Sequence, residues 1–262
     1  RVKICGNRTP ADVIAAAEAG ADFVGIIFAE SPRHVTAEDA AMMVQALGGP
    51  ASVANPHEFA PGVRDDIGRW FEHGAHLLQE QLDGTGPLTV GVFADQPIDE
   101  VNALADAAGV DLVQLSGDES WEDCLAVTRP VIQVVHVSPI DSPADPMQFV
   151  VPGFARALML DSAHGPYRGG SGKAFNWDVA HEVASHMPLW LAGGLTPENV
   201  GDAIDRTRPW LVDVGSGTET DGRKDHALVR AFIDAVRETA SASDTAIETT
   251  PETASETAEA CQ

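Results

Sequence analysis

Short apolar runs alternate with helix-favouring segments along most of the chain. The runs are nearly continuous in Val, Ile and Leu, which is typical of parallel strands buried on both faces. The predicted strands are residues 2–5, 22–28, 89–93, 111–115, 131–137, 155–161, 189–192 and 210–214. The predicted helices are residues 9–19, 36–47, 97–108, 119–127, 177–186, 197–205 and 225–239. This α/β alternation predicts a single (β/α)8 TIM barrel, with a doubly wound open sheet as the alternative.

Two segments interrupt the alternation. Residues 48–88 open with Gly48-Gly49-Pro50 and continue into a helix predicted over residues 64–82. In a barrel, this insertion between a helix and the next strand lies on the N-terminal face, opposite the active site, so we expect it to serve packing or oligomer contact. Residues 138–152 contain four prolines, so the helix after the fifth strand is expected to be missing or vestigial.

The C-terminal residues 240–262 are mostly Ala, Ser, Thr and Glu and have no hydrophobic period. We predict a disordered acidic tail there, and one catalytic barrel domain over residues 1–239. The tail holds five acidic residues and no basic residue, whereas the whole chain has a formal net charge of −24. Most of the acidity therefore belongs to the folded part.

Composition excludes several classes of function. Proteins that bind nucleic acid need a basic surface, and this chain has 40 acidic against 16 basic residues. The acidity favours a salt-adapted surface, on which dissolved salt screens self-repulsion. Its apolar runs are too short to span a membrane, and its three cysteines form no C-x-x-C pair. We expect a soluble cytoplasmic protein that binds neither nucleic acid nor membranes.

Chemistry-bearing residues stand at the ends of two predicted strands. Cys5 closes the first strand and Asp161 the sixth, and the C-terminal strand ends of a barrel surround one cavity. Taken singly, such a cysteine is more often a packing residue, and such an aspartate a cap or ion-pair partner. Beside a phosphate site they form a complementary pair, a thiolate as base and a carboxylic acid as proton donor.

Glycines follow the last two strands, as Gly193-Gly194 and Gly215-Ser216-Gly217. A single glycine pair at such a junction more often serves the turn alone. Two adjacent junctions favour phosphate binding, because backbone N–H groups can approach an anion closely there. A phosphorylated small molecule is therefore the predicted substrate.

A third glycine-rich segment, residues 169–173, is similar to the nucleotide-binding P-loop. It departs from that motif at Tyr167, where glycine is required, and at Ala174, where a magnesium-binding hydroxyl is required. We therefore exclude ATP binding and expect a loop that closes over the ligand.

In combination, these residues resemble the phosphoribosylanthranilate isomerase family of tryptophan biosynthesis. The resemblance spans nearly the whole body except residues 48–88 and the tail. Its motifs are Lys3-Ile4-Cys5-Gly6, Gly20-Ala21-Asp22-Phe23-Val24-Gly25, Ser31-Pro32-Arg33, Val90-Gly91-Val92-Phe93, Val113-Gln114-Leu115, Leu160-Asp161, Gly169-Gly170-Ser171-Gly172-Lys173, Leu191-Ala192-Gly193-Gly194-Leu195 and Val212-Asp213-Val214.

The resemblance implies an Amadori rearrangement of N-(5-phosphoribosyl)anthranilate to 1-(2-carboxyphenylamino)-1-deoxyribulose 5-phosphate, without metal or organic cofactor. It makes Asp161 the general acid, Cys5 the general base and Arg33 the partner of the anthranilate carboxylate. The further substrate-binding residues that it implies are Gly169, Gly170, Gly172 and Asp213. The expected assembly is a monomer or homodimer, with contact to other enzymes of the pathway.

Two positions depart from the family pattern. Ser116 stands where family members usually have histidine, and Gly215 where they usually have serine. Both departures concern substrate contacts rather than the acid–base pair. Two alternatives remain: another isomerase or lyase of phosphorylated sugars on the same barrel, and a catalytically silent binding subunit.

Overall fold

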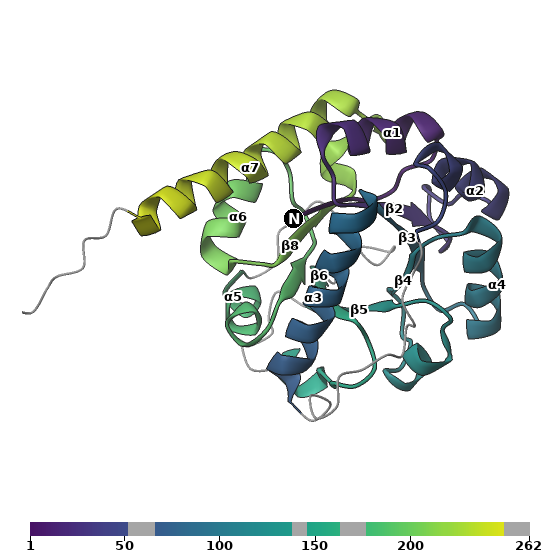
Figure 1. Ribbon diagram of the computed structural model, residues 1–262, viewed down its shortest axis with the longest axis horizontal. Coiled ribbons are helices and arrows are strands. Elements are labelled where there is room, and N and C mark those ends of the chain that lie inside the picture. Colours follow the sequence, from purple (N-terminus) through teal and green to yellow (C-terminus); the bar gives the residue numbers. More distant parts are fainter. Residues whose placement is uncertain (52–65, 138–145, 163–176, 249–262) are drawn as a thin grey trace, which may run out of the picture.

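Eight parallel strands close into a barrel in the computed structural model of the chain (Figure 1). The structure describes residues 1–51, 66–137, 146–162 and 177–248. The strands are β1 Val2–Ile4, β2 Phe23–Ile27, β3 Leu88–Phe93, β4 Leu112–Leu115, β5 Val131–Val137, β6 Ala157–Ser162, β7 Leu189–Leu191 and β8 Leu211–Val214. Each pairs with the next in the chain, and β1 pairs with β8. This closure confirms the predicted (β/α)8 barrel and excludes the open sheet.

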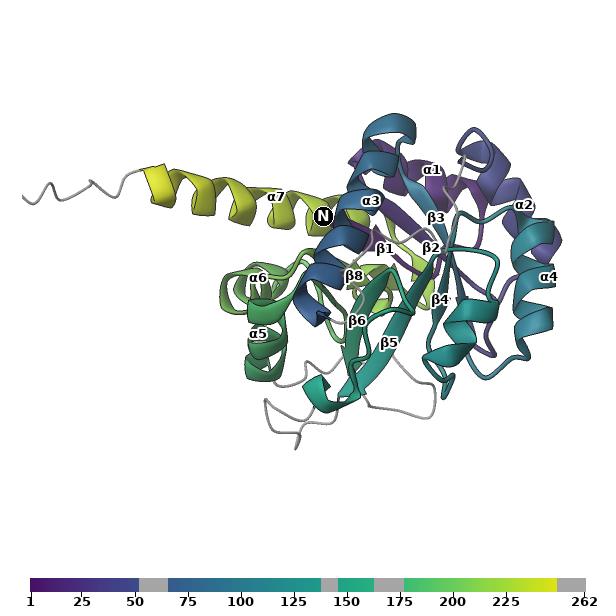
Figure 2. The ribbon, with the colours of Figure 1, turned by 60° about the horizontal axis from the view of Figure 1, so that its bottom comes forward.

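Helices surround the strands, and short 3-10 turns complete the connections (Figures 1 and 2). The α-helices are α1 Pro10–Ala19, α2 Ala37–Ala46, α3 Ile67–Thr85, α4 Ile98–Ala108, α5 Trp177–His186, α6 Val200–Thr207 and α7 His226–Glu248. The 3-10 turns are η1 Glu122–Ala126, η2 Pro146–Phe149 and η3 Ser216–Thr218. A two-stranded hairpin, β9 Glu219–Thr220 and β10 Arg223–Lys224, follows η3.

The strands are buried on both faces, which explains their continuous apolar sequences. Alternate residues point to opposite sides of a strand. On β2, Phe23 joins a cluster inside the barrel, whereas Val24 and Ile26 join the larger cluster between the strands and the helices. Lys3 and Asp213 are buried on the neighbouring strands β1 and β8, opposite each other in register.

Helix α3 closes the N-terminal end of the barrel. Its Leu78 is fully buried in the interior cluster that contains Phe23 and Trp190. The indole Nε1 of Trp70 donates a hydrogen bond of 2.7 Å to the carbonyl oxygen of Ala155, just before β6. Near the other end of the helix, the Nε of Arg1 donates to Gln79 over 2.6 Å. The insertion thus supplies part of the core on the face opposite the strands' C-terminal ends.

We expect the substitution Leu78→Ala to lower the free energy of unfolding by about 2–5 kcal/mol, because it leaves a cavity in a fully buried site. Leu77→Ala is the matched control, since this neighbouring leucine is only half-buried and should cost less. Urea unfolding of both variants measures the difference. Equal losses of unfolding free energy in the two variants would contradict the conclusion that Leu78 fills the N-terminal end of the barrel.

Several element boundaries differ from those expected from the sequence. Residues 119–127 were predicted as a helix, but only the 3-10 turn η1 forms, and Pro130 stands directly before β5. Helix α3 begins at Ile67 and ends at Thr85, later at both ends than predicted. Helix α7 continues to Glu248, beyond the predicted end at residue 239. Residues 240–248 of the predicted tail therefore belong to a helix, and the rest lie outside the described residues.

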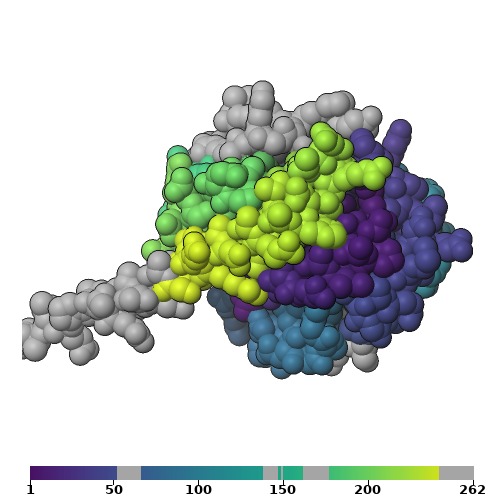
Figure 3. All heavy atoms as spheres, turned by 90° about the horizontal axis from the view of Figure 1, so that it is seen from above, coloured from purple at the N-terminus to yellow at the C-terminus, as the bar shows by residue number. Residues whose placement is uncertain are grey.

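The last helix returns to the start of the chain. Figure 3 shows α7 lying along α1, and His226 Nε2 lies 3.1 Å from Asp12 Oδ1. The C-terminal part of α7 extends past the barrel body in Figures 1 and 2. No helix in the described part of the chain is long and apolar enough to cross a membrane.

Candidate active site

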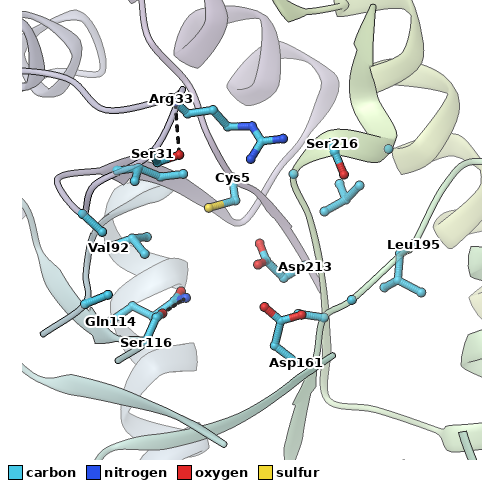
Figure 4. Close-up of a pocket in the computed structure, with 18 of the residues that line it drawn as sticks. Cys5, Ser31, Arg33, Val92, Gln114, Ser116, Asp161, Leu195, Asp213 and Ser216 are labelled. Atoms are coloured by element: carbon cyan, nitrogen blue, oxygen red, sulfur yellow. Dashed lines mark hydrogen bonds between the residues drawn. The ribbon is translucent and has the colours of Figure 1, made fainter. Parts of the chain in front are cut away.

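The C-terminal strand ends surround a cavity of about 370 Å³. Both predicted catalytic residues, Cys5 and Asp161, line it, together with Arg33 and Asp213. The glycine-rich turns after β7 and β8 also contribute to its wall, with Gly193, Gly194, Gly215, Ser216 and Gly217. Figure 4 shows the side chains of Cys5, Asp213 and Asp161 facing the same space. The predicted substrate-binding residues Gly169, Gly170 and Gly172 lie outside the described residues.

Cys5 directly follows β1 and is held at the barrel rim. Its backbone N–H donates a hydrogen bond of 2.8 Å to the carbonyl oxygen of Val214 on β8, and the residue as a whole is 8% exposed. A Cβ added to Gly25 on β2 would lie 2.7 Å from the Cys5 sulfur, closer than packed atoms approach. Glycine at this position therefore makes room for the thiol.

The charge environment of Cys5 has two opposing parts. Burial raises the pKa of the thiol, because a thiolate is poorly solvated there. The ammonium of Lys3 acts in the opposite direction, through its positive charge. Asp213 also raises the thiol pKa through its negative charge, although its Oδ1 accepts from Lys3 Nζ over 3.0 Å.

Arg33 is held by a carboxylate from the hairpin after β8. Its Nε and Nη2 donate hydrogen bonds of 2.7 and 3.1 Å to the two oxygens of Glu219. Burial would lower the Arg33 pKa, but Glu219 raises it overall. This paired geometry fixes the guanidinium plane and leaves Nη1 outside the contact with Glu219.

Lys224 ties the ends of β1 and β8 together. Its side chain is 1% exposed, and its ammonium donates to the carbonyl oxygens of Cys5 over 2.7 Å and Gly215 over 3.0 Å. A third bond of 3.1 Å reaches the hydroxyl of Thr218. Two of the ammonium protons therefore hold the backbone after the neighbouring strands β1 and β8, and the third holds the Thr218 side chain.

The two glycine-rich turns pack directly against each other. Gly193 and Gly194 have φ angles of 96° and 67°, in the region that favours glycine. A side chain on Gly217 would collide with the carbonyl oxygen of Leu195. Backbone groups from both turns consequently border one end of the cavity, as a phosphate site on this fold requires.

Ser116 occupies the opposite side of the cavity. Its hydroxyl accepts a hydrogen bond of 2.9 Å from Gln114 Nε2, and its carbonyl oxygen lies 2.8 Å from His136 Nε2. His136, on β5, is opposite Asp161 on β6 in the strand register. An imidazole thus stands beside Ser116, directly after β4.

Sequence reasoning missed three charged residues of this region, namely Lys3, Glu219 and Lys224. Lys3 appeared only as part of a motif, and the other two come from the hairpin after the last strand. One signal was present, because the chain has only three lysines, at positions 3, 173 and 224. Because lysine is so rare in this strongly acidic chain, each lysine marks a position where an ammonium group is needed.

Comparison with known proteins shows the family to which the chain belongs. Residues 67–235 match the family model described as N-(5'phosphoribosyl)anthranilate (PRA) isomerase. The N-(5'-phosphoribosyl)anthranilate isomerase of Geobacter sulfurreducens is 40% identical over 235 residues, 89% of this chain and 96% of that protein. The chain belongs to the phosphoribosylanthranilate isomerase family.

Structural similarity extends over the same length. The crystal structure of phosphoribosyl anthranilate isomerase from Thermus thermophilus is 29% identical, with a TM-score of 0.67, and the match covers 91% of this chain and 98% of that one. A multifunctional tryptophan biosynthesis protein of Phycomyces blakesleeanus is 37% identical over 250 residues. These are 89% of this chain but 32% of that protein, so the segment similar to this chain is there part of a longer chain.

Proposed function

We propose that the cavity catalyses the Amadori rearrangement of N-(5-phosphoribosyl)anthranilate to 1-(2-carboxyphenylamino)-1-deoxyribulose 5-phosphate. Membership of the phosphoribosylanthranilate isomerase family makes the chain an isomerase of tryptophan biosynthesis. The observation that carries the residue roles is the convergence of a thiol, a carboxyl group and an arginine on one cavity. These are the groups that acid–base catalysis on an anionic substrate needs.

Asp161 acts as the general acid in this proposal. Its carboxyl group donates a proton to the ring oxygen of the ribose, so the C1′–O bond breaks and the ring opens to a protonated Schiff base. Cys5, as a thiolate, then removes the proton from C2′, and the electron pair moves to the imine to give an enolamine. The enolamine tautomerises to the ketone product, and no external oxidant or reductant is required.

Arg33 and the glycine turns hold the two ends of the substrate. The anthranilate carboxylate meets the Arg33 guanidinium, whose plane Glu219 orients and whose charge Glu219 supports. The phosphate lies against Gly193, Gly194, Gly215, Ser216 and Gly217. Asp213 contacts the sugar between the two ends, since it lines the same cavity. Gly169, Gly170 and Gly172 belong to the loop that closes over the substrate.

The loss of substrate fluorescence tests this proposal. Freshly prepared N-(5-phosphoribosyl)anthranilate is mixed with the full chain, and we expect the fluorescence to decay in proportion to enzyme concentration. No decay above the spontaneous rate would overturn the proposal and would favour a silent binding subunit. Turnover of another phosphorylated sugar in place of this substrate would favour a different isomerase or lyase.

We further propose that the acidic surface adapts the enzyme to salt. With a formal charge of −24, the folded chain repels itself at low ionic strength, and salt screens this repulsion. The free energy of unfolding should therefore rise from low to multimolar potassium chloride. Urea unfolding in chloride is the suitable measurement, because sulfate stabilises most folds by exclusion. A flat or falling stability would contradict the adaptation.

The cellular setting follows from the same chemistry. A base that must remain a free thiol suits a reducing compartment, which supports a cytoplasmic location. The enzyme acts as a monomer or homodimer. The longer Phycomyces relative supports contact with other enzymes of the tryptophan pathway. Neither nucleic acid nor a membrane is a partner in this proposal.

A further inference from the structure

A lysine side chain lies buried within the barrel beneath the proposed base. Lys3 is 0% exposed and precedes Cys5 by two positions, so both side chains point to the same face of the chain at β1. Its Nζ lies 3.0 Å from Oδ1 of Asp213, its register partner on β8. A fully buried lysine is rare unless a partner compensates its charge. Asp213 compensates the charge of Lys3, and Lys3 and Cys5 also interact electrostatically.

Lys3 and Cys5 stabilise each other's charged forms. Burial would lower the pKa of Lys3, but the negative charges of Asp213 and Cys5 raise it overall. Burial raises the pKa of Cys5, and Lys3 is the strongest opposing influence. The ammonium therefore remains charged in the barrel, next to a thiol that must lose a proton to act as a base.

The surrounding charges balance when Cys5 is ionised. We define the rim cluster as Lys3, Cys5, Arg33, Asp213, Glu219 and Lys224, which are linked by ion pairs and electrostatic contacts. Its three basic side chains face two carboxylates, so the cluster is positive with a thiol and neutral with a thiolate. Ionised side chains in a buried site are more stable when opposite charges neutralise them.

Two further acidic groups line the same cavity. Glu30 is exposed at the cavity mouth, where solvent screens its charge. In the proposed reaction Asp161 is neutral until it donates its proton to the ring oxygen, and it is a carboxylate afterwards. Gly25 of β2, which lies against the thiol, is uncharged, and so are the cavity-lining residues Ile27 of β2, Gln114 of β4 and Ser116.

We propose that Lys3 is a positioning residue for the reaction: its ammonium, anchored by Asp213, stabilises the thiolate form of Cys5. This inference rests on the proposed role of Cys5 as the base. It gives the spacing Lys3-Ile4-Cys5 a physical reason, because alternate residues share a face at β1. A purely structural role is the alternative, in which Lys3 serves only to neutralise buried Asp213.

Alkylation of Cys5 by iodoacetamide, measured against pH, tests the inference without requiring turnover. The background is Cys124→Ser, Cys261→Ser, which leaves Cys5 as the only cysteine in the sequence. In this background we expect Lys3→Met to move the midpoint of the alkylation profile upward by about one pH unit or more, because the thiolate loses its cation. Asp213→Asn should move it downward, because the negative charge that opposes the thiolate is gone.

The opposite directions make the test specific. Both variants break the same ion pair, so mere loss of packing would change the two profiles in the same sense. No shift in a folded Lys3→Met protein, or shifts of equal sign, would overturn the inference. If circular dichroism shows that the Lys3→Met protein does not fold, the alkylation profile of Asp213→Asn is the deciding measurement. An unchanged or raised midpoint in that profile would overturn the inference.

Turnover gives a second readout. At neutral pH, kcat/KM of Lys3→Met should fall as the thiolate fraction falls, and Lys3→Arg should recover part of it by restoring the cation. Absence of isomerase turnover in the wild type would reject the proposed function, while the alkylation profiles would still decide whether Lys3 acts on Cys5. The two failures are therefore distinguishable.

Discussion

Replacing Asp161 by asparagine is expected to lower kcat by about 10²–10⁴-fold, the usual contribution of a positioned general acid. Asparagine has nearly the same shape and can still occupy the end of β6, but it cannot donate a proton to the ring oxygen. Because the phosphate and carboxylate contacts lie elsewhere in the cavity, KM should change little. Steady-state fluorescence measurements with N-(5-phosphoribosyl)anthranilate separate the two parameters.

Asp106→Asn is the control for this substitution. Asp106 is a largely exposed carboxylate that pairs with Arg129 over 2.8 Å, outside the cavity. It undergoes the same chemical change, and its kcat should equal that of the wild type. An Asp161→Asn enzyme with undiminished kcat would remove Asp161 from the mechanism, whatever its effect on KM.

Cys5→Ser is expected to lower kcat by a similar factor of about 10²–10⁴. A serine hydroxyl has a far higher pKa than a thiol, so almost none is ionised, even beside Lys3. The smaller oxygen also fits in the space that Gly25 leaves for the thiol, so folding should be preserved. The same fluorescence assay measures the loss, and circular dichroism checks the fold.

The chain offers a matched control in Cys124→Ser. Cys124 is also a buried free cysteine, 1% exposed, and its thiol contacts Gln133 Oε1 over 3.4 Å. Burial raises its pKa to about 12, and it does not line the cavity. This variant should keep full kcat with at most a modest loss of stability. Equal kcat losses in both variants would mean that Cys5→Ser acts through the fold rather than through proton transfer.

Sequence patterns were most reliable where local and tertiary preferences coincide. Helix α1 shows this, because Thr9 and Asp12 form a reciprocal capping box and Gly20 adopts φ 95° at its end. The sequence patterns failed after β4, where residues 119–127 favour a helix locally but only the 3-10 turn η1 forms before Pro130. Helix α7 was predicted too short, because its Ala- and Ser-rich end has no hydrophobic period although the helix continues to Glu248. A hydrophobic period arises where a helix packs against the protein body, so a helical segment that extends past the body has no such period in its sequence.

The sequence by itself determined the order of the strands and which residues stand at their C-terminal ends. Parallel strands bring those ends to one side, so Cys5, Asp161 and the glycine turns could be placed around one cavity before any contact was known. This inference needs only the chain direction and the alternation of apolar runs with helices.

Only the tertiary structure decided how the charges around Cys5 are compensated. Lys3 and Asp213 are 210 positions apart, Arg33 and Glu219 186, and Lys224 and Cys5 219. Such pairs arise because β1 closes the barrel against β8 and the hairpin after β8 folds over that seam. No local pattern encodes which cation meets which anion across that distance, because the pairing depends on the register of two strands from opposite ends of the chain.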